Sequence, residues 1–123
     1  MIDDKLKQEI KRVLKPIIEQ SEKMQREISG VICINSYNNE VYDYHVISIG
    51  DVKSVSMGNS IKYHKNPNIY QISFHTHPTG GGGYPLFSHS DEIVINERMR
   101  IGIDFGSCVG SVYGIRCRLL ELR

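Results

Sequence analysis

One stretch, residues 74–91, constrains the fold of this chain more than any other: F-H-T-H-P-T-G-G-G-G-Y-P-L-F-S-H-S-D. It overlaps an apolar, β-prone run that predicts a strand over 69–77. Pro78 has no N–H to donate to a sheet ladder, so the strand should end there. The glycines at 80–83 allow a sharp, open excursion of the backbone. Ser88 is a favourable N-cap, which predicts that a helix begins where this loop ends.

The spacing within this stretch predicts a metal site. Side chains alternate across a β-strand, so His75 and His77 share a face and can converge on one ion at the strand end. A helix that begins at Ser88 places Asp91 on its first turn, where a carboxylate can face back toward the strand. Three protein ligands leave a fourth position for water, as in catalytic zinc sites, whereas a structural site is closed by a fourth ligand. We therefore expect one zinc ion per chain, held by His75, His77 and Asp91.

The length and composition are those of one ordinary globular domain. The chain has 123 residues, of which 40% are hydrophobic and 24% are charged, so we expect a single domain over 1–123 with its own core. The formal net charge is +1, which argues against a nucleic-acid partner. No apolar run approaches the roughly 20 residues that span a bilayer, and the charged N-terminus contains no signal-peptide block. We expect a cytoplasmic protein that does not contact membranes.

The three cysteines, Cys33, Cys108 and Cys117, form no C-x-x-C pair and lie in apolar runs. Such residues are expected to be reduced, buried thiols rather than parts of a disulfide framework. Cys108, in the sequence G-S-C-V-G, is an alternative nucleophile, but no activating group is recognisable around it.

The N-terminal part of the chain predicts a long amphipathic helix. Apolar residues recur at steps of three and four over residues 2–28, which is the helical period. Pro16 interrupts this pattern, but the apolar stripe keeps its phase across it, which favours one kinked helix over two helices. The apolar face should pack on a sheet; the alternative is a helix that binds a partner. Gly30 is expected to end the helical region.

Most of the remaining chain predicts strands. In chain order, we expect strands over 31–35, 40–49, 69–77, 101–109 and 111–122. The asparagines in 36–39 predict the turn of a hairpin. Residues 50–59 predict a loop in which a short strand could be hidden. The helix that begins at Ser88 should continue to about Met99.

Three pieces of the sequence together resemble a known motif. They are His75-Thr-His77-Pro78, then Ser88-x-x-Asp91, with Glu27-x-x-Gly30 upstream. In this order they resemble the JAMM motif of the JAB/MPN family of zinc metalloproteases, in its prokaryotic form. The resemblance implies a single α/β (α+β) domain with a curved, mixed β-sheet flanked by helices, similar to the layout of cytidine deaminases. The deaminase signature P-C-x-x-C is absent from the sequence, so deaminase activity is not implied.

The resemblance also implies a role for each residue. His75, His77 and Asp91 hold one zinc ion. Glu27 takes a proton from the metal-bound water and later passes it to the leaving amine, and Ser88 donates a hydrogen bond to the oxyanion. This division suits amide hydrolysis, because zinc lowers the pKa of its water from 15.7 toward about 7. One carboxyl group can serve first as base and then as acid.

Each piece of the motif has an ordinary explanation when it is taken alone. Two histidines on a strand are common, Ser-x-x-Asp is also a helix-capping box, and a glutamate at a helix end is usually solvated. Glu22 is close enough in sequence to compete with Glu27 for the role of base. His45 and His64 are expected to be surface or half-buried histidines, and His89 to point away from the metal. The conjunction of the pieces, in the right order, favours a metal site.

These observations predict an enzyme, a zinc-dependent peptidase or isopeptidase with a polypeptide substrate. In prokaryotic relatives the targets include ubiquitin-like and sulfur-carrier proteins with a Gly-Gly tail, and such a tail suits a narrow cleft because glycine lets backbones approach closely. The acyl side of the substrate is expected to add along a sheet edge. The chain has little room for the insertions with which eukaryotic relatives hold ubiquitin, and a homodimer is one way to complete the gripping surface.

The spacing also departs from the usual motif, since ten residues separate His77 from Ser88, more than the motif usually has. Two alternatives remain open. One is a metal-binding scaffold with little activity that acts through protein–protein contacts; the complete set of five site residues argues against it. The other is a hydrolase of a small-molecule amide. A pocket closed around the zinc would favour the small amide, and an open groove would favour a polypeptide.

Overall fold

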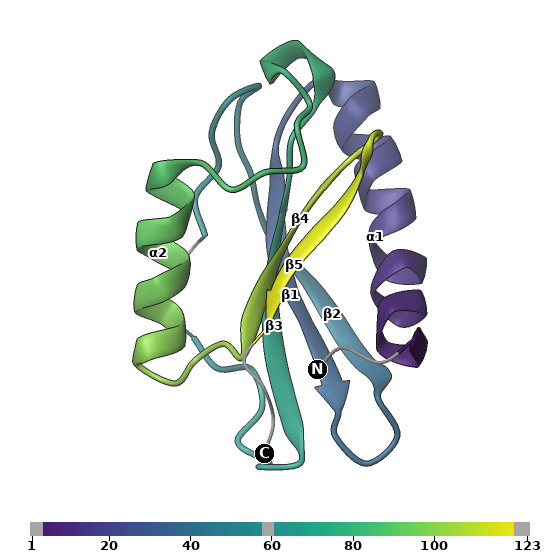
Figure 1. The fold of residues 1–123 in the computed structure, drawn as a ribbon, viewed down its shortest axis with the longest axis vertical. Helices are drawn as coiled ribbons and strands as arrows, with labels where there is room; N and C mark the ends of the chain where they lie inside the picture. The colour runs from purple at the N-terminus through teal and green to yellow at the C-terminus, as the bar shows by residue number, and fades with distance from the viewer. Residues whose placement is uncertain (1–3, 58–60, 120–123) are drawn as a thin grey trace.

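A mixed β-sheet forms the middle layer of the protein, and the two helices of the described part cover its opposite faces (Figure 1). The structure is a computed structural model that describes residues 4–57 and 61–119. In chain order its elements are α1 (Asp4–Met24), β1 (Ile28–Asn35), β2 (Glu40–Ile49), β3 (Ile69–Thr76), the 3-10 turn η1 (Thr79–Gly81), α2 (His89–Arg100), β4 (Gly106–Ser111) and β5 (Gly114–Leu119). The predicted α+β class is confirmed. The outer parts of the first helix and last strand that we predicted, and positions 58–60 of the loop, lie outside the described residues.

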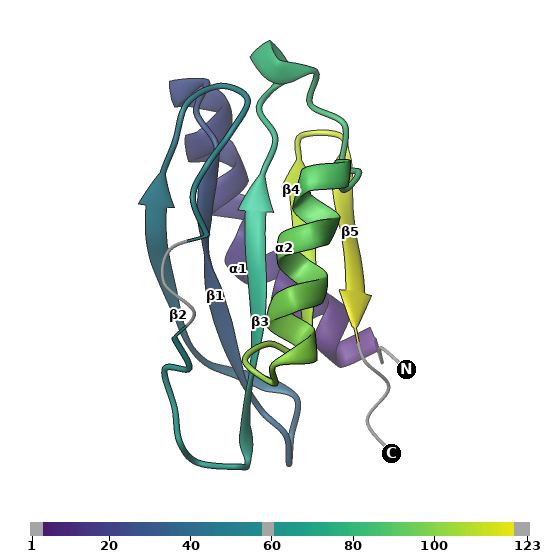
Figure 2. The ribbon, with the colours of Figure 1, turned by 90° about the vertical axis from the view of Figure 1, so that its left-hand side faces the viewer.

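The strands lie side by side in the order β2-β1-β3-β4-β5 (Figure 2). The β3–β4 pair is parallel, and the other neighbouring pairs are antiparallel. A parallel pair needs a crossover connection, which α2 supplies here. The chain therefore passes from the carboxyl end of β3 through the glycine loop, residues 78–87, to the start of α2. The end of β3 and the start of α2 thus lie at the same end of the sheet.

The helix α1 packs its apolar face on the sheet, as its sequence period predicts. Its buried residues are Leu6, Ile10, Val13, Leu14, Ile17, Ile18 and Ser21. They form one cluster with sheet residues that include Ile32, Ile72 and Phe74. The helix continues through Pro16 without dividing, so the prediction of one helix rather than two is confirmed. It ends at Met24, earlier than predicted, because Gln25 has a positive φ, which breaks the helix, and the sheet begins at Ile28.

The glycine at position 30 does not end the helix, so that prediction was wrong. Gly30 lies inside β1, opposite Phe74 of β3. A Cβ atom on Gly30 would come within 2.6 Å of the Phe74 ring. The residue is therefore small because a side chain has no room there, and not because the chain reverses. As a result β1 begins at Ile28, directly after Glu27.

The cysteines of the last two strands differ from the prediction. Cys108 and Cys117 form a disulfide, so the expectation of reduced thiols was wrong for this pair. The two residues lie directly opposite each other in the β4–β5 register. This pairing excludes Cys108 as a free nucleophile. Cys33 is free and buried, as predicted.

The closing hairpin is shorter than predicted, since β4 begins only at Gly106. The residues between α2 and β4 are held by a buried ion pair instead, in which Arg98 Nε lies 2.6 Å from Asp104 Oδ2. Gln71 Nε2 of β3 donates to the other oxygen of Asp104 at 2.9 Å. Asp104 thus joins the end of α2 to the centre of the sheet. The short strand considered within 50–59 does not occur in the described residues 50–57.

Candidate functional site

The carboxyl end of β3 places two histidines beside the first turn of α2. His75 lies opposite Ser29 of β1 and Val109 of β4, and only 2% of its surface is exposed. His77 follows the strand, and its N–H donates to the carbonyl oxygen of Gly110 at 2.9 Å. The backbone at both positions is therefore fixed by neighbouring strands. The strand itself ends one residue earlier than predicted.

A capping box begins α2, as the sequence predicts. The Ser88 hydroxyl accepts the Asp91 N–H at 3.1 Å, and Asp91 Oδ2 accepts the Ser88 N–H at 2.9 Å. These reciprocal bonds satisfy two N–H groups at the helix start. They also hold the Asp91 carboxylate on the side of the first turn that faces β3.

Three potential ligand atoms converge between the strand end and the helix start. His75 Nε2 lies 3.1 Å from His77 Nε2 and 3.1 Å from Asp91 Oδ2. His77 Nε2 lies 3.6 Å from the same Asp91 oxygen. The structure therefore brings together all three side chains that the sequence assigns to a metal. Neutral imidazole nitrogens and carboxylate oxygens are ligands that suit zinc.

The carbonyl oxygen of Tyr84 orients the ring of His77. His77 Nδ1 lies 2.8 Å from this oxygen, which can only accept a hydrogen bond, so Nδ1 carries a proton. In the neutral ring, Nε2 then presents a lone pair toward His75 and Asp91. His75 Nδ1 is buried and has no hydrogen-bond partner in the described structure. Sequence reasoning missed Tyr84, because its backbone makes the contact and no side-chain pattern signals it.

The side chain of Glu27 reaches the same site from the start of β1. The backbone of Glu27 is held on both sides: its N–H donates to the Asp51 carbonyl oxygen at 2.7 Å, and its carbonyl oxygen accepts the Gly50 N–H at 2.8 Å. Glu27 is 5% exposed, and one of its carboxylate oxygens lies within 4.8 Å of a ring nitrogen of both His75 and His77. The carboxyl group is thus close to the converging atoms without belonging to the close triad.

The environment separates the two carboxyl groups in acidity. Burial raises the pKa of Glu27 to about 7; the charge of His77 opposes this shift and that of Asp91 adds to it. Burial also acts to raise the pKa of Asp91, but hydrogen bonds from His75 and His77 outweigh it and hold that pKa well below its usual range. For His77, burial acts to lower the pKa, but the Asp91 carboxylate, the Tyr84 carbonyl and the charge of Glu27 together outweigh it and raise the pKa. Such separation is typical of a proton-transfer group beside a fixed charge.

The second glutamate that the sequence left open, Glu22, has a different place. Its carboxylate accepts the Thr79 N–H at 3.0 Å and also the Thr79 hydroxyl. Beside it, Gln25 Oε1 accepts the Gly80 N–H. These bonds fasten the start of the glycine loop to the end of α1. Of the two glutamates, it is Glu27 that the structure places beside the histidines.

A cleft of about 680 Å³ opens over the site. It is lined by the five predicted residues, by segment 52–57 and by residues of α2. Segment 52–57 forms a wall of this cleft and is fastened to β1 by a hydrogen bond from the Ser29 hydroxyl to Ser56 O at 2.5 Å. Exposed residues, among them Ser88 and Ser90, line the cleft, so it is open to solvent. The sequence pattern did not show this wall, because the segment has no regular period.

Of the other histidines, His45 and His64 are half-buried, as predicted, and His89 is exposed. His45 and His64 also lie close to Cys33 and Asp43, in a second group of potential metal ligands. Sequence reasoning missed this group, because its members meet only through strand register and a long loop.

A scan of the chain against models of known protein families finds no match, and a search of curated proteins finds no similar sequence. Among residues 4–57 and 61–119, no helix is both long and apolar enough to cross a membrane. The geometry of the site is therefore the basis for a functional proposal.

Proposed function

We propose that this chain is a zinc-dependent peptidase or isopeptidase of the JAMM type. The observation that carries the proposal is the convergence of His75 Nε2, His77 Nε2 and Asp91 Oδ2 within 3.1–3.6 Å of one another. These atoms line an open cleft, and the Glu27 carboxylate lies beside them. A mixed sheet with a helix on each face is compatible with the JAB/MPN layout that the motif implies.

The spacing of the three atoms fits a tetrahedral zinc ion. Nitrogen and oxygen ligands about 2.0–2.2 Å from zinc lie about 3.3–3.6 Å apart at tetrahedral corners, close to the separations in this site. The contact with Tyr84 leaves the lone pair of His77 Nε2 available, and the ionised Asp91 supplies a negative charge. Three protein ligands leave one position for water or substrate, which is the arrangement of catalytic zinc sites.

The residues around this position suit amide hydrolysis. When bound, zinc supplies a Lewis acid that polarises a carbonyl group and lowers the pKa of a water molecule. Glu27, whose pKa is raised by burial, accepts a proton from the attacking water and returns it to the leaving amine. The Ser88 hydroxyl already accepts the Asp91 N–H, so its own proton points elsewhere. That proton can be donated to the oxyanion of the substrate.

The shape of the cleft favours a polypeptide over a small amide. Its exposed lining leaves room for an extended chain between segment 52–57 and α2. The backbone of such a chain can bond to the backbone of the segment, as in recognition by strand addition. A Gly-Gly tail of a ubiquitin-like or sulfur-carrier protein is the substrate class that we propose, because two glycines allow the closest backbone approach.

The test is incubation of the protein with conjugates of Gly-Gly-tailed modifiers from its host, with and without a chelator. We expect cleavage directly after the tail, loss of cleavage with the chelator, and recovery when zinc is added back. Mass spectrometry of the products identifies the bond that is cut. Cleavage that survives complete zinc removal would contradict the zinc mechanism. If the zinc-loaded protein leaves every conjugate uncleaved, the proposed substrate class is contradicted.

A further inference from the structure

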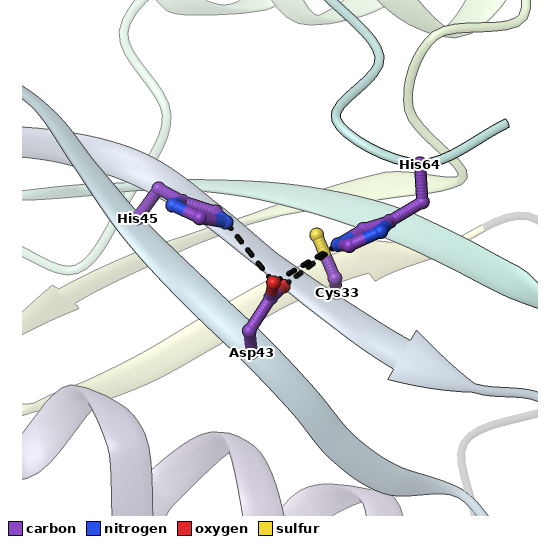
Figure 3. A group of neighbouring side chains, drawn as sticks. All are labelled: Cys33, Asp43, His45 and His64. Atoms are coloured by element: carbon purple, nitrogen blue, oxygen red, sulfur yellow. Dashed lines mark hydrogen bonds and ion pairs between the residues drawn. The ribbon is translucent and has the colours of Figure 1, made fainter.

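A second group of potential metal ligands lies on the sheet face that carries the candidate site. Cys33 comes from β1, Asp43 and His45 come from β2, and His64 comes from the loop before β3 (Figure 3). One ligand atom of each lies within 4.8 Å of those of the other three. Ser29, which is opposite His75, has the same parity in β1 as Cys33. The two groups are therefore separated by four residues of β1, roughly 13 Å.

The carboxylate of Asp43 is the centre of this group. His64 Nε2 lies 3.0 Å and His45 Nε2 lies 3.2 Å from Asp43 Oδ2, and the Cys33 thiol donates to the same carboxylate. His45 Nε2 is buried and, although it lies only 3.2 Å from Asp43 Oδ2, it makes no hydrogen bond with a described residue. Figure 3 shows the ligand ends of all four side chains directed toward one another. The protein thus leaves a buried nitrogen unsatisfied next to a thiol, a carboxylate and a second imidazole.

Two tyrosines hold the imidazole rings in this orientation. Tyr63 stacks on His45 with ring centroids 4.3 Å apart, and Tyr42 meets His64 edge-on at 5.0 Å. The loop that carries Tyr63 and His64 is itself attached to the sheet, because the Tyr63 N–H donates to Gln71 Oε1 at 3.1 Å. The four side chains are therefore held close together before any ion binds, which is what a precise metal site requires.

We infer that Cys33, Asp43, His45 and His64 form a second, structural zinc site. One thiolate, one carboxylate and two imidazoles supply four ligands, which fill a tetrahedral shell and leave no position for substrate. Their two negative charges balance the charge of the ion. Thiolate and imidazole ligands suit zinc, whereas calcium and magnesium prefer oxygen ligands alone. The site would fasten the loop that leads into β3 to the β1–β2 hairpin.

A cysteine–histidine nucleophile is the competing explanation for these residues. The Cys33 side chain is fully buried, so a substrate cannot reach its sulfur. Burial, with the nearby Asp43 carboxylate, raises the pKa of this thiol to about 12, the opposite of an activated cysteine. When zinc binds, the thiol proton leaves to solvent and the thiolate takes its place as ligand.

The test counts zinc in purified, folded protein by elemental analysis. We expect two zinc ions per chain in the wild type, one in His64→Ala and one in Asp91→Ala. The double variant should contain none. His89→Ala, which removes an exposed histidine outside both groups, is the matched control and should keep two. A His64→Ala protein that keeps as much zinc as the control would overturn the second site.

Cobalt replacement identifies the ligand. The cobalt-loaded wild type and Asp91→Ala should both show an intense thiolate-to-cobalt charge-transfer band. The proposed ligands of the first site, His75, His77 and Asp91, contain no sulfur, so the band comes from the second site. Cys33→Ser should therefore lack it. Circular dichroism checks that Cys33→Ser is folded. If it is not, the loop variant His64→Ala carries the same test, because it should lose the second metal and with it the band. A wild-type cobalt spectrum without the band refutes the second site and leaves the peptidase proposal intact. A band that persists in Asp91→Ala supports the second site whether or not the peptidase proposal holds.

Discussion

The carboxylate of Asp91 and the backbone of Ser88 are joined through the same oxygen that faces the histidines. Asp91 Oδ2 accepts the Ser88 N–H at 2.9 Å and lies 3.1 Å from His75 Nε2. Helix capping and the proposed metal ligation therefore do not compete. The cap fixes the position of the oxygen from which the ligand set is built, so a defect in the cap should also be a defect in the site.

The first prediction concerns Ser88. Ser88→Ala removes the cap acceptor, which should lower the free energy of unfolding by about 1 kcal/mol, and it removes the proposed oxyanion donor, which should lower kcat about a hundredfold. Ser88→Thr keeps a hydroxyl that can cap and donate, so it should retain most of both. Urea unfolding and turnover on a conjugate substrate measure the two effects. Wild-type kcat in Ser88→Ala would remove this residue from the mechanism.

The second prediction concerns the ligands. His75→Ala and Asp91→Ala should each lose one zinc ion per chain relative to the wild type, together with all chelator-sensitive activity, because two ligands hold zinc much more weakly than three. His89→Ala is the control with a histidine removed outside the site. Elemental analysis after exhaustive dialysis gives the count. Full zinc content in both ligand variants would refute the assignment.

The third prediction separates Glu27 from metal binding. Glu27→Gln should keep the zinc content of the wild type and lose turnover by about a hundredfold or more, because an amide cannot accept the proton. Glu22→Gln is the matched control, since Glu22 holds the glycine loop through Thr79 and not the reacting groups. We expect a much smaller loss of kcat from this control. Equal losses in the two variants would mean that Glu27 acts only through the shape of the site.

The site residues could be predicted because local rules place them. Strand alternation puts His75 and His77 on one face, Pro78 ends the pairing, and capping chemistry begins α2 at Ser88. Each of these rules acts within a few residues, so a sequence pattern is enough to apply it. The same reasoning placed the return strand of the hairpin, β2, with its correct bounds.

The features that sequence reasoning missed depend on register and packing between distant segments. The Cys108–Cys117 disulfide requires the two residues to be opposite in β4 and β5. Gly30 is small because Phe74, from another strand, occupies the space above it. Cys33 meets Asp43 only because β1 and β2 pair in one register. No short-range pattern contains this information.

The fourth prediction tests the buried ion pair between Arg98, in the last turn of α2, and Asp104, in the segment before β4. Arg98 and Asp104 are 3% and 2% exposed, so Asp104→Asn removes the negative charge opposite a buried guanidinium. The free energy of unfolding should fall by about 3 kcal/mol or more. Glu97→Gln, which weakens the exposed Glu97–Arg100 pair on the same helix, should change it little. If urea unfolding shows similarly small changes in the free energy of unfolding for both variants, the buried Arg98–Asp104 ion pair does not determine stability.

The fifth prediction concerns the pH dependence of stability through Glu9. This residue joins α1 to β2, since its carboxylate accepts the Val41 N–H at 3.0 Å as well as a bond from Arg12. The hydrogen bond from Arg12, with that from Val41, lowers the pKa of Glu9 in the folded protein. Below the ordinary glutamate pKa, about 4.3, the unfolded chain therefore binds this proton more readily than the folded one.

The stabilisation from Glu9 is consequently present above about pH 4.3 and is lost as the pH falls through the lowered pKa of the folded state. Glu9→Gln should be less stable than the wild type at pH 7, by about 0.5 kcal/mol, and the gap should narrow as the pH is lowered. Urea unfolding of both proteins between pH 7 and pH 3 measures the gap, with Glu19→Gln as an exposed control on the same helix. A gap of constant size over this range would show that the charge of Glu9 does not contribute, and that its effect comes from the shape of the side chain alone.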